Sequence, residues 1–254
     1  MPLGTGENYT ERVLRTLDAN SVQDHIKAVF FVQTHVAIRG ASDVGQQVIT
    51  RQASAGHLVG IHTGSTEDHV DHRTRARAPA YDWNHDGVVN ELDGANGLES
   101  DLRRAADRIK RLTGTEPQLV RPTYGATNAR VLAAYNTLGL HMLLWHVDSR
   151  DALDNGRGPA VVEANLRRQV REQIRAGHGT IVILFHDIVA TTSTHLDDYL
   201  IAVYEAAEAD GKLATFPTSS DELLEWLDDA LGLGHELMGS KPYELAPADS
   251  DGIR

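Results

Sequence analysis

The sequence predicts an α/β protein built on a parallel sheet or barrel, because short apolar runs alternate with helical patterns along most of its 254 residues. The apolar runs are rich in β-branched and aromatic residues and lack polar alternation, which is typical of parallel strands covered on both faces. The stretches between them repeat apolar residues every three to four positions, as amphipathic helices do. The length suits one large domain or two small ones.

Six of the apolar runs are predicted as strands, at 28–32, 58–61, 118–121, 142–145, 180–185 and 213–216. Three helices carry the clearest apolar faces. Their apolar residues are Leu98, Leu102, Ala105, Ile109 and Leu112 in the first, Val161, Leu166, Val170 and Ile174 in the second, and Leu224 and Leu227 in the third, which opens at Ser220 with Asp221 and Glu222. We expect one domain over 1–232 with an insertion at 64–96, followed by a polar tail at 233–254.

Charge and cysteine content exclude several classes of protein. The formal net charge of −12 repels phosphate backbones, so no nucleic-acid partner is expected. The lack of cysteine excludes a disulfide framework, a thiolate zinc site and a cysteine nucleophile. No apolar run reaches about 18 residues, so no membrane span is expected. The opening Met1-Pro2-Leu3-Gly4 does not have the pattern of a signal peptide.

Chemically useful side chains follow four of the predicted strands. In α/β proteins the chemistry lies at the carboxyl ends of the strands. The residues at these four ends are, in chain order, His62-Thr63, Arg121-Pro122-Thr123-Tyr124-Gly125, Asp148 with Asp151, and His186-Asp187. A single histidine at a strand end is more often structural, but four such ends in this order predict a functional site.

The order of these motifs resembles the polysaccharide deacetylase family, carbohydrate esterase family four. Residues 56–63 resemble its second motif, where a strand delivers a His followed by Ser or Thr, and 121–125 resemble the third, with Thr123 in place of a Pro. Residues 145–151 resemble the fourth motif, with Ala152 where the family usually has Trp, and 184–187 resemble the fifth. The resemblance covers about residues 1–230 and implies a distorted seven-stranded (β/α) barrel.

The first motif of that family is the main departure. Residues 8–14 resemble the family's first helix, which follows a strand ending in Asp-Asp-Gly-Pro, and Pro2 matches the Pro of that motif. We therefore expect the two aspartates, and the first of the seven strands, to lie upstream of residue 1. The resemblance implies that one aspartate is the general base and the other a metal ligand, so the chain as given is expected to show essentially no activity.

The resemblance implies metal-dependent hydrolysis of N- or O-acetyl groups from a polysaccharide such as peptidoglycan, chitin or xylan. A divalent metal, with zinc suited to imidazole and carboxylate ligands, polarises the acetyl carbonyl and activates water. His62 is the first ligand expected. The family's second ligand follows four residues later, where this chain has Thr66, so His69 is favoured in a longer loop and His72 is the alternative. The full-length protein is expected to be secreted, periplasmic or part of the cell envelope.

The resemblance also implies roles for the other strand-end residues. His186 would be the general acid that protonates the leaving amine or alkoxide. Asp151 would hold its charge and orientation, whereas Asp187 is expected to satisfy backbone groups at the strand end. The backbone N–H of Tyr124 would donate to the oxyanion. Arg121 would orient the base, and in this chain it is expected to be an unpaired cation.

The insertion contains a second candidate metal site at residues 82–93. Oxygen-bearing residues fall at loop positions one, three, five, nine and twelve, with Gly87 at six, which is the spacing of a helix-loop-helix calcium loop. The loop also resembles the calcium loop of dockerin repeats, which end in Asp. The expected ligands are the side chains of Asp82, Asn84, Asp86 and Asp93, the carbonyl of Val88, and Asn90 through a water. One such loop, where dockerins have two, predicts a structural clamp.

Two other functions remain open at this point. The chain could be a non-catalytic glycan-binding or scaffold homologue that kept the pocket and lost the acids. It could also be an unrelated metal-dependent hydrolase on an α/β barrel, which would place the metal away from His62. The residues upstream of Met1 would distinguish the first of these from the enzyme.

Overall fold

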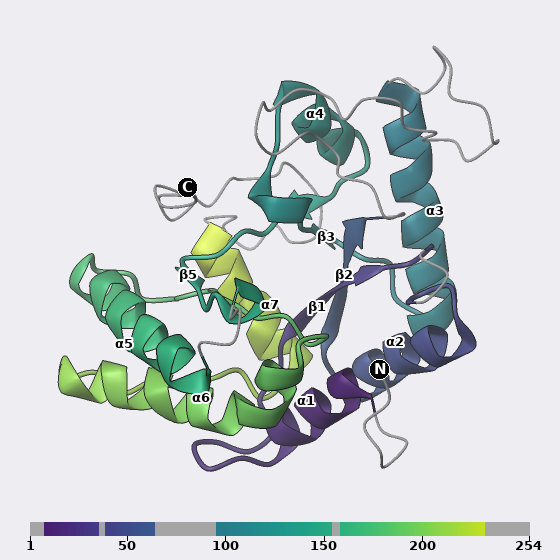
Figure 1. Ribbon diagram of the computed structural model, residues 1–254. Coiled ribbons are helices and arrows are strands. Elements are labelled where there is room, and N and C mark those ends of the chain that lie inside the picture. The colour runs from purple at the N-terminus through teal and green to yellow at the C-terminus, as the bar shows by residue number, and fades with distance from the viewer. Residues whose placement is uncertain (1–7, 36–38, 64–94, 154–157, 232–254) are drawn as a thin grey trace. The chain divides into compact units, whose positions relative to one another are not determined.

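The computed structural model describes residues 8–35, 39–63, 95–153 and 158–231 (Figure 1). They fall into two compact units: one takes its described residues from 8–27 and 145–230, and the other from 28–144. The predicted tail lies outside the described residues. So does the predicted insertion, apart from residues 95 and 96, which begin a helix.

The unit over residues 28–144 is a parallel sheet with strand order β1-β2-β3-β4, covered by helices. The register pairs Val29 with Leu58, Ile61 with Val120, and Leu119 with His141. Its elements are β1 (Val29–Gln33), α2 (Asp43–Ser54), β2 (Leu58–Thr63), α3 (Ala95–Thr113), β3 (Leu119–Val120), the 3₁₀ turn η1 (Thr123–Gly125), α4 (Ala129–Thr137) and β4 (His141–Met142).

The core of this unit follows the predicted apolar faces. Leu102, Ala105 and Ile109 on α3 are buried, as the spacing predicts, and so are Ile61 on β2 and Val120 on β3. Ile61 and Val120 are register partners on neighbouring strands, and both are apolar and buried, as in other parallel sheets covered by helices.

Gly60 keeps β2 close to its neighbours. A Cβ at this position would lie 2.8 Å from the carbonyl oxygen of Leu119 and 2.8 Å from the ring of Phe31. Only glycine fits that approach without moving the backbone of β3. The position of β2, which carries His62, therefore depends on this glycine.

The other unit packs helices against a two-stranded parallel sheet, β5-β6. A core cluster of Val147, Val162, Leu166, Val170, Tyr199, Val203 and Ala206 joins β5 to helices α5 and α6. The elements of this unit are α1 (Tyr9–Asp18), β5 (Val147–Asp148), the 3₁₀ turn η2 (Asp151–Leu153), α5 (Pro159–Arg175), β6 (Ile183–Leu184), α6 (Ala190–Ala209) and α7 (Ser220–Leu231).

Helix starts follow local capping chemistry. The side chain of Asn8 accepts a hydrogen bond of 2.8 Å from the N–H of Glu11 and so caps α1. At α7, the hydroxyl of Ser219 accepts from the N–H of Glu222, while the carboxylate of Glu222 accepts from the N–H of Thr218. Ser219 thus caps the helix while Glu222 holds the residue before the cap, which agrees with the predicted start at Ser220.

The predicted strand at 213–216 is wrong. The structure assigns no strand there, and Leu213 is 72% exposed. The side-chain amide of Gln23 donates to the carbonyl of Phe216 at 2.6 Å and accepts from its N–H at 3.0 Å. One side chain thus takes the hydrogen bonds that a neighbouring strand would otherwise make.

Three further predictions change in detail. The run 142–145 contributes to the strand His141–Met142, and a separate strand, Val147–Asp148, follows it. The run 180–185 forms a strand only at Ile183–Leu184. On α5, Val161 is 47% exposed and its neighbour Val162 is buried, because the tertiary core selects the face of the helix. Both sheets are parallel and carry helices, as the α/β prediction requires, while the seven-stranded barrel stays a prediction.

Among the helices that the structure describes, none has the length and apolar character needed to cross a bilayer.

Candidate active site

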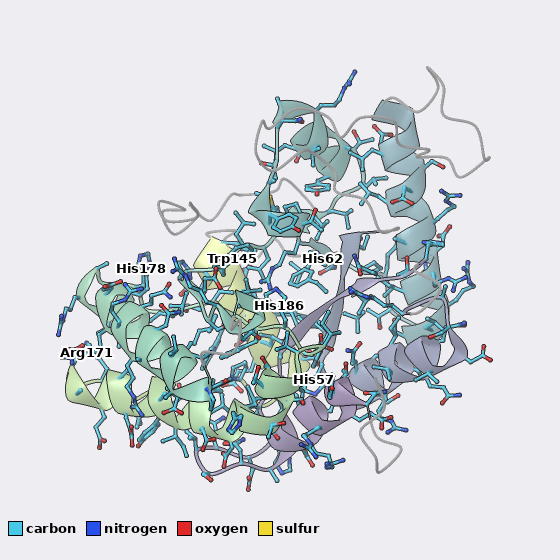
Figure 2. The ribbon with its side chains drawn as sticks, in the orientation of Figure 1. His57, His62, Trp145, Arg171, His178 and His186 are labelled. Atoms are coloured by element: carbon cyan, nitrogen blue, oxygen red, sulfur yellow. The ribbon has the colours of Figure 1, made fainter. Side chains whose placement is uncertain are left out.

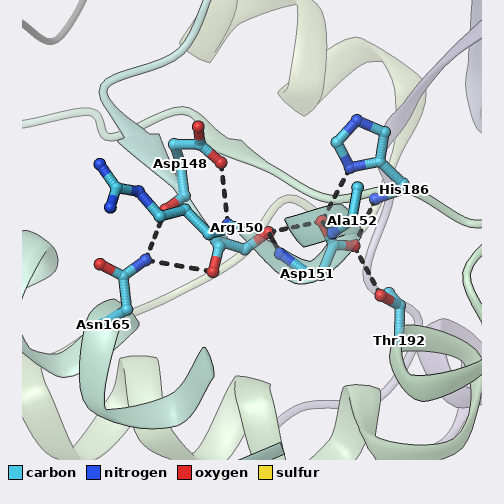
Figure 3. Close-up of polar contacts among 8 residues, drawn as sticks. Asp148, Arg150, Asp151, Ala152, Asn165, His186 and Thr192 are labelled. Atoms are coloured by element: carbon cyan, nitrogen blue, oxygen red, sulfur yellow. Dashed lines mark hydrogen bonds and ion pairs between the residues drawn. The ribbon is translucent and has the colours of Figure 1, made fainter. Parts of the chain in front are cut away.

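His186 and Asp151 form a hydrogen-bonded pair. His186 follows β6, and its Nδ1 lies 2.7 Å from Oδ1 of Asp151 in η2 (Figure 3). The Asp151 side chain is fully buried, whereas that of His186 is 39% exposed. The pair therefore joins a buried carboxylate to an imidazole that reaches solvent, and the pairing itself is the one that the resemblance implied.

Asp151 accepts hydrogen bonds on both oxygens. Oδ1 receives the Ser149 hydroxyl at 3.0 Å and the Ala152 N–H at 2.9 Å, besides His186. Oδ2 receives the backbone N–H of His186 at 2.7 Å and the hydroxyl of Thr192 at 2.5 Å. A buried carboxylate is costly unless its lone pairs are satisfied, and here donors from three parts of the chain satisfy them.

These contacts shift the pKa values of both partners. Burial alone would lower the pKa of His186, but the hydrogen bond and charge of Asp151, with the charges of Asp148 and Asp187, raise it above its ordinary value. Burial alone would raise the pKa of Asp151, but its bonds to His186 and Thr192 lower it. The pair thus favours a carboxylate beside an imidazolium, which is the protonation state that a general acid needs.

Asp187 makes a side-chain contact that the sequence did not predict. Its Oδ2 accepts a hydrogen bond of 2.6 Å from the hydroxyl of Thr10 on α1. The expectation that Asp187 serves backbone groups missed this side-chain contact, because the contact spans 177 positions of sequence. It ties the loop after β6 to α1 and keeps a carboxylate near His186.

The loop between β5 and η2 is held by helix α5. The amide of Gln169 accepts from the N–H of Asp148 at 3.2 Å and donates to its carbonyl at 2.6 Å. Asn165 donates to the carbonyls of Asp148 and Ser149 at 2.7 and 3.1 Å (Figure 3). These bonds fix the backbone that leads to Asp151, and sequence reasoning identified neither side chain.

His62 lies in the other unit, near the end of β2 (Figure 2). Its Nδ1 lies 2.7 Å from the carbonyl oxygen of Arg121. A carbonyl only accepts, so Nδ1 carries the hydrogen and Nε2 carries the lone pair. Metal-ligating histidines commonly show this arrangement, so His62 fits the role of a ligand through Nε2.

The other predicted metal ligands all fall between residues 64 and 94. His69 and His72 lie outside the described residues, as do the expected calcium ligands Asp82, Asn84, Asp86, Val88, Asn90 and Asp93. Within the described ranges, no group of three or more His, Cys, Asp or Glu side chains is arranged to hold a metal ion. His57, on the same segment as His62, instead accepts a hydrogen bond from the N–H of Ala28 and packs edge-on to Phe30 (Figure 2).

Arg121 is not an unpaired cation, so that prediction was wrong. Its Nε donates to the carbonyl of Leu143 at 2.9 Å and a terminal nitrogen donates to that of Leu144 at 3.2 Å. The guanidinium also lies 4.2 Å from the ring centroid of Phe31. Burial lowers its pKa to about 9, which still leaves it charged at neutral pH. Carbonyls past the end of β4 and an aromatic face thus stabilise the charge.

Tyr124 follows Arg121 in a strained turn. Its backbone has φ 54 and ψ 16, the left-handed region that few residues other than glycine adopt, and Gly125 is also left-handed at φ 63. The Tyr124 side chain is 68% exposed. Strain of this kind costs about 1–3 kcal/mol and is concentrated at functional sites, which suits the loop predicted to stabilise an oxyanion.

A family model for polysaccharide deacetylases matches residues 2–143, more than half of the chain. The chain belongs to the polysaccharide deacetylase family. A chitin deacetylase of Pestalotiopsis is 28% identical to this chain over 184 residues. The aligned region covers 72% of this chain and 51% of the Pestalotiopsis protein. A peptidoglycan-N-acetylglucosamine deacetylase of Listeria monocytogenes is 26% identical over 78% of the chain and 33% of its own length. The chain thus spans about half of the first relative and about a third of the second.

Solved structures share the fold. A family 4 acetyl xylan esterase from Clostridium thermocellum, in complex with a cobalt ion, has a TM-score of 0.61 at 17% identity, covering 94% of this chain and 93% of its own. At this identity the likeness shows the α/β fold of the family. The resemblance inferred from the strand-end motifs is therefore confirmed at the level of family and fold class.

Proposed function

We propose that this family member is a metal-dependent carbohydrate deacetylase that removes N- or O-acetyl groups from a polysaccharide. The observation that carries the proposal is the His186–Asp151 pair, in which a buried carboxylate raises the pKa of a partly exposed imidazole and so favours its protonated form. Hydrolysis of an acetyl amide or ester needs such a group, because the leaving amine or alkoxide must take up a proton.

In this mechanism each residue of the chain has a defined task. Nδ1 of His186 donates to Asp151, so the proton that is transferred to the leaving group comes from Nε2. The left-handed turn at Tyr124 supports its backbone N–H as the donor to the developing oxyanion. Arg121, held by Phe31 and two carbonyls, would orient the general base.

The metal would be held by His62 together with His69, or with His72 in its place, and zinc suits these imidazole ligands. When bound, it would polarise the acetyl carbonyl and activate the attacking water. The cobalt ion in the acetyl xylan esterase structure supports a divalent metal in this family. Chitin and peptidoglycan, named for the relatives, are polymers outside the cytoplasm, which supports action in the cell envelope or beyond it.

Acetate release tests the proposal directly. Because the resemblance expects two aspartates ahead of Pro2, the assay compares the 254-residue chain with one extended by a strand ending in Asp-Asp-Gly. Chitin oligomers, peptidoglycan fragments and acetylated xylan serve as substrates, with zinc or with chelator. We expect the extended, zinc-loaded protein to release acetate, chelator to abolish the release, and the shorter chain to release essentially none.

Two outcomes would contradict the proposal or part of it. If the extended protein holds zinc but releases acetate from none of the three polymers, the non-catalytic glycan-binding reading is the better one. If the 254-residue chain works at the rate of the extended one, another carboxylate serves as base, and Asp68 and Asp71 are the first to replace.

We also propose that residues 82–93 bind calcium as a structural clamp, supported by the spacing of their oxygen-bearing side chains. Replacing Asp82 and Asp86 together by alanine should abolish the rise in melting temperature that calcium produces in the parent. Replacing Asp68 and Asp71 together, outside the loop, is the control with the same change of charge. If calcium and chelator leave the melting temperature of the parent unchanged, the segment is only a polar turn.

A further inference from the structure

Thr192 makes a contact with Asp151 that none of the family motifs includes. Its hydroxyl donates to Oδ2 of Asp151 at 2.5 Å, and its side chain is buried with the residue only 1% exposed. The two residues are 41 positions apart in sequence. Five donors from the described part of the chain reach this carboxylate, and of these Thr192 alone belongs to helix α6 (Figure 3).

The two oxygens of Asp151 have different tasks. Oδ1 faces Nδ1 of His186, whereas Oδ2 receives the backbone N–H of His186 and the Thr192 hydroxyl. The terminal torsion of an Asp side chain is broad, so its rotation is set by hydrogen bonds more than by rotamer preference. The donors on Oδ2 therefore act together with Ser149 and Ala152, which donate to Oδ1, in keeping Oδ1 aligned with the imidazole.

Thr192 also differs from the hydroxyl residues beside it. Ser193 and Thr194 both donate back to the carbonyl of Ala190, as Ser and Thr commonly do within helices. The Thr192 hydroxyl instead leaves the helix for Asp151. It does so from the first turn of α6, where the helix dipole favours a nearby negative charge.

From this geometry we propose that Thr192 is a positioning residue for the general acid: its hydroxyl holds the Asp151 carboxylate in the rotation that keeps Oδ1 on Nδ1 of His186. The proposal rests on the proposed function only for the role of His186 as an acid. Among the described residues, the charged groups that act on His186 are Asp151, Asp148 and Asp187, and a change at Thr192 removes none of them.

Titration of His186 by NMR, without substrate, tests the alignment. In Thr192→Val the carboxylate loses one of its two donors on Oδ2, so its alignment with the imidazole weakens and the pKa of His186 should fall toward its ordinary value of 6.5. Thr192→Ser keeps the hydroxyl and should keep the raised pKa. Thr194→Val, which removes a neighbouring exposed hydroxyl, is the matched control and should leave the pKa of His186 at the parent value. Thr192→Ala repeats the measurement with a smaller side chain in case the valine variant misfolds.

The opposite shift would overturn the proposal. If the hydroxyl only stabilised the charge of Asp151 without orienting the carboxylate, its removal would leave a more basic carboxylate. That carboxylate would raise the pKa of His186 further. An unchanged pKa would likewise show that the other donors suffice.

In the extended, zinc-loaded protein, Thr192→Val should lower kcat roughly tenfold with little change in KM, the size typical of supporting contacts around catalytic groups. The two proposals can fail separately. If the pKa of His186 falls in Thr192→Val but neither the parent nor any variant releases acetate, the positioning role stands and the deacetylase assignment fails.

Discussion

Replacing His186 by alanine in the extended, zinc-loaded protein should lower kcat by roughly 10²–10⁴-fold, the usual contribution of a positioned general acid. Zinc content should stay at the parent level, because the hydrogen-bond partner of His186 is Asp151 and the expected metal ligands lie elsewhere in the sequence. Acetate release and bound zinc, measured on the same samples, check both halves of the prediction.

The matched control is His195→Ala. His195 on α6 also pairs Nδ1 with a carboxylate, that of Asp198 at 3.0 Å, but this carboxylate is 55% exposed and the pair lies outside the proposed machinery. We expect it to keep the parent rate. If His186→Ala and His195→Ala have the same activity, His186 is not the acid.

The pH dependence gives the same residue a second test. A general acid must be protonated, so the parent rate should fall as pH rises through the raised pKa of His186.

The stability of the fold should depend on pH in the same direction. The raised pKa of His186 adds stability that is complete below pH 6.5 and is lost as pH rises through the pKa of the folded state. The lowered pKa of Asp151 adds stability above 3.8 that is lost as pH falls. His186→Ala should therefore lower the melting temperature more near pH 5 than near pH 9, a difference that should be small because the imidazole is partly exposed.

The strand-end residues could be predicted from the sequence because their signals are local. A buried apolar run followed by His62, Arg121 or His186 identifies both the strand and the polar residue at its end. The helix through Leu102 and Ile109 was equally clear, because its apolar spacing is regular and the structure buries those positions. For these residues, local pattern and tertiary structure agree.

The supporting residues could not be predicted, because their contacts join distant parts of the chain. Thr192 belongs to a run of four hydroxyl residues, Thr191 to Thr194, and nothing in the run marks the one that reaches Asp151. In the sequence, nothing distinguishes Gln169 from other polar residues of a helix, although its amide forms two hydrogen bonds with the backbone of Asp148. The false strand at 213–216 has the same origin, since the side chain of Gln23 satisfies backbone groups that pattern alone assigns to a neighbouring strand.

Replacing His62 by alanine should remove both zinc and activity, which separates its role from that of His186. The hydrogen bond from Nδ1 to the carbonyl of Arg121 orients the ring and leaves Nε2 as the ligand atom. Loss of a supporting contact to a metal ligand typically costs 10–100-fold in affinity, so loss of the ligand itself should exceed roughly a hundredfold.

Zinc affinity is best measured by competition with a chromogenic chelator, on the parent, His62→Ala and the control His195→Ala. Circular dichroism checks that β2 still folds without the imidazole. His62→Gln, which keeps a polar side chain on the strand, repeats the test if the alanine variant is unstable. If both His62 variants bind zinc as tightly as the parent, the metal lies away from β2. That result would favour an unrelated metal-dependent hydrolase over the proposed deacetylase. If zinc is lost but acetate release persists, the hydrolysis depends on the chain's own acid and base without the metal.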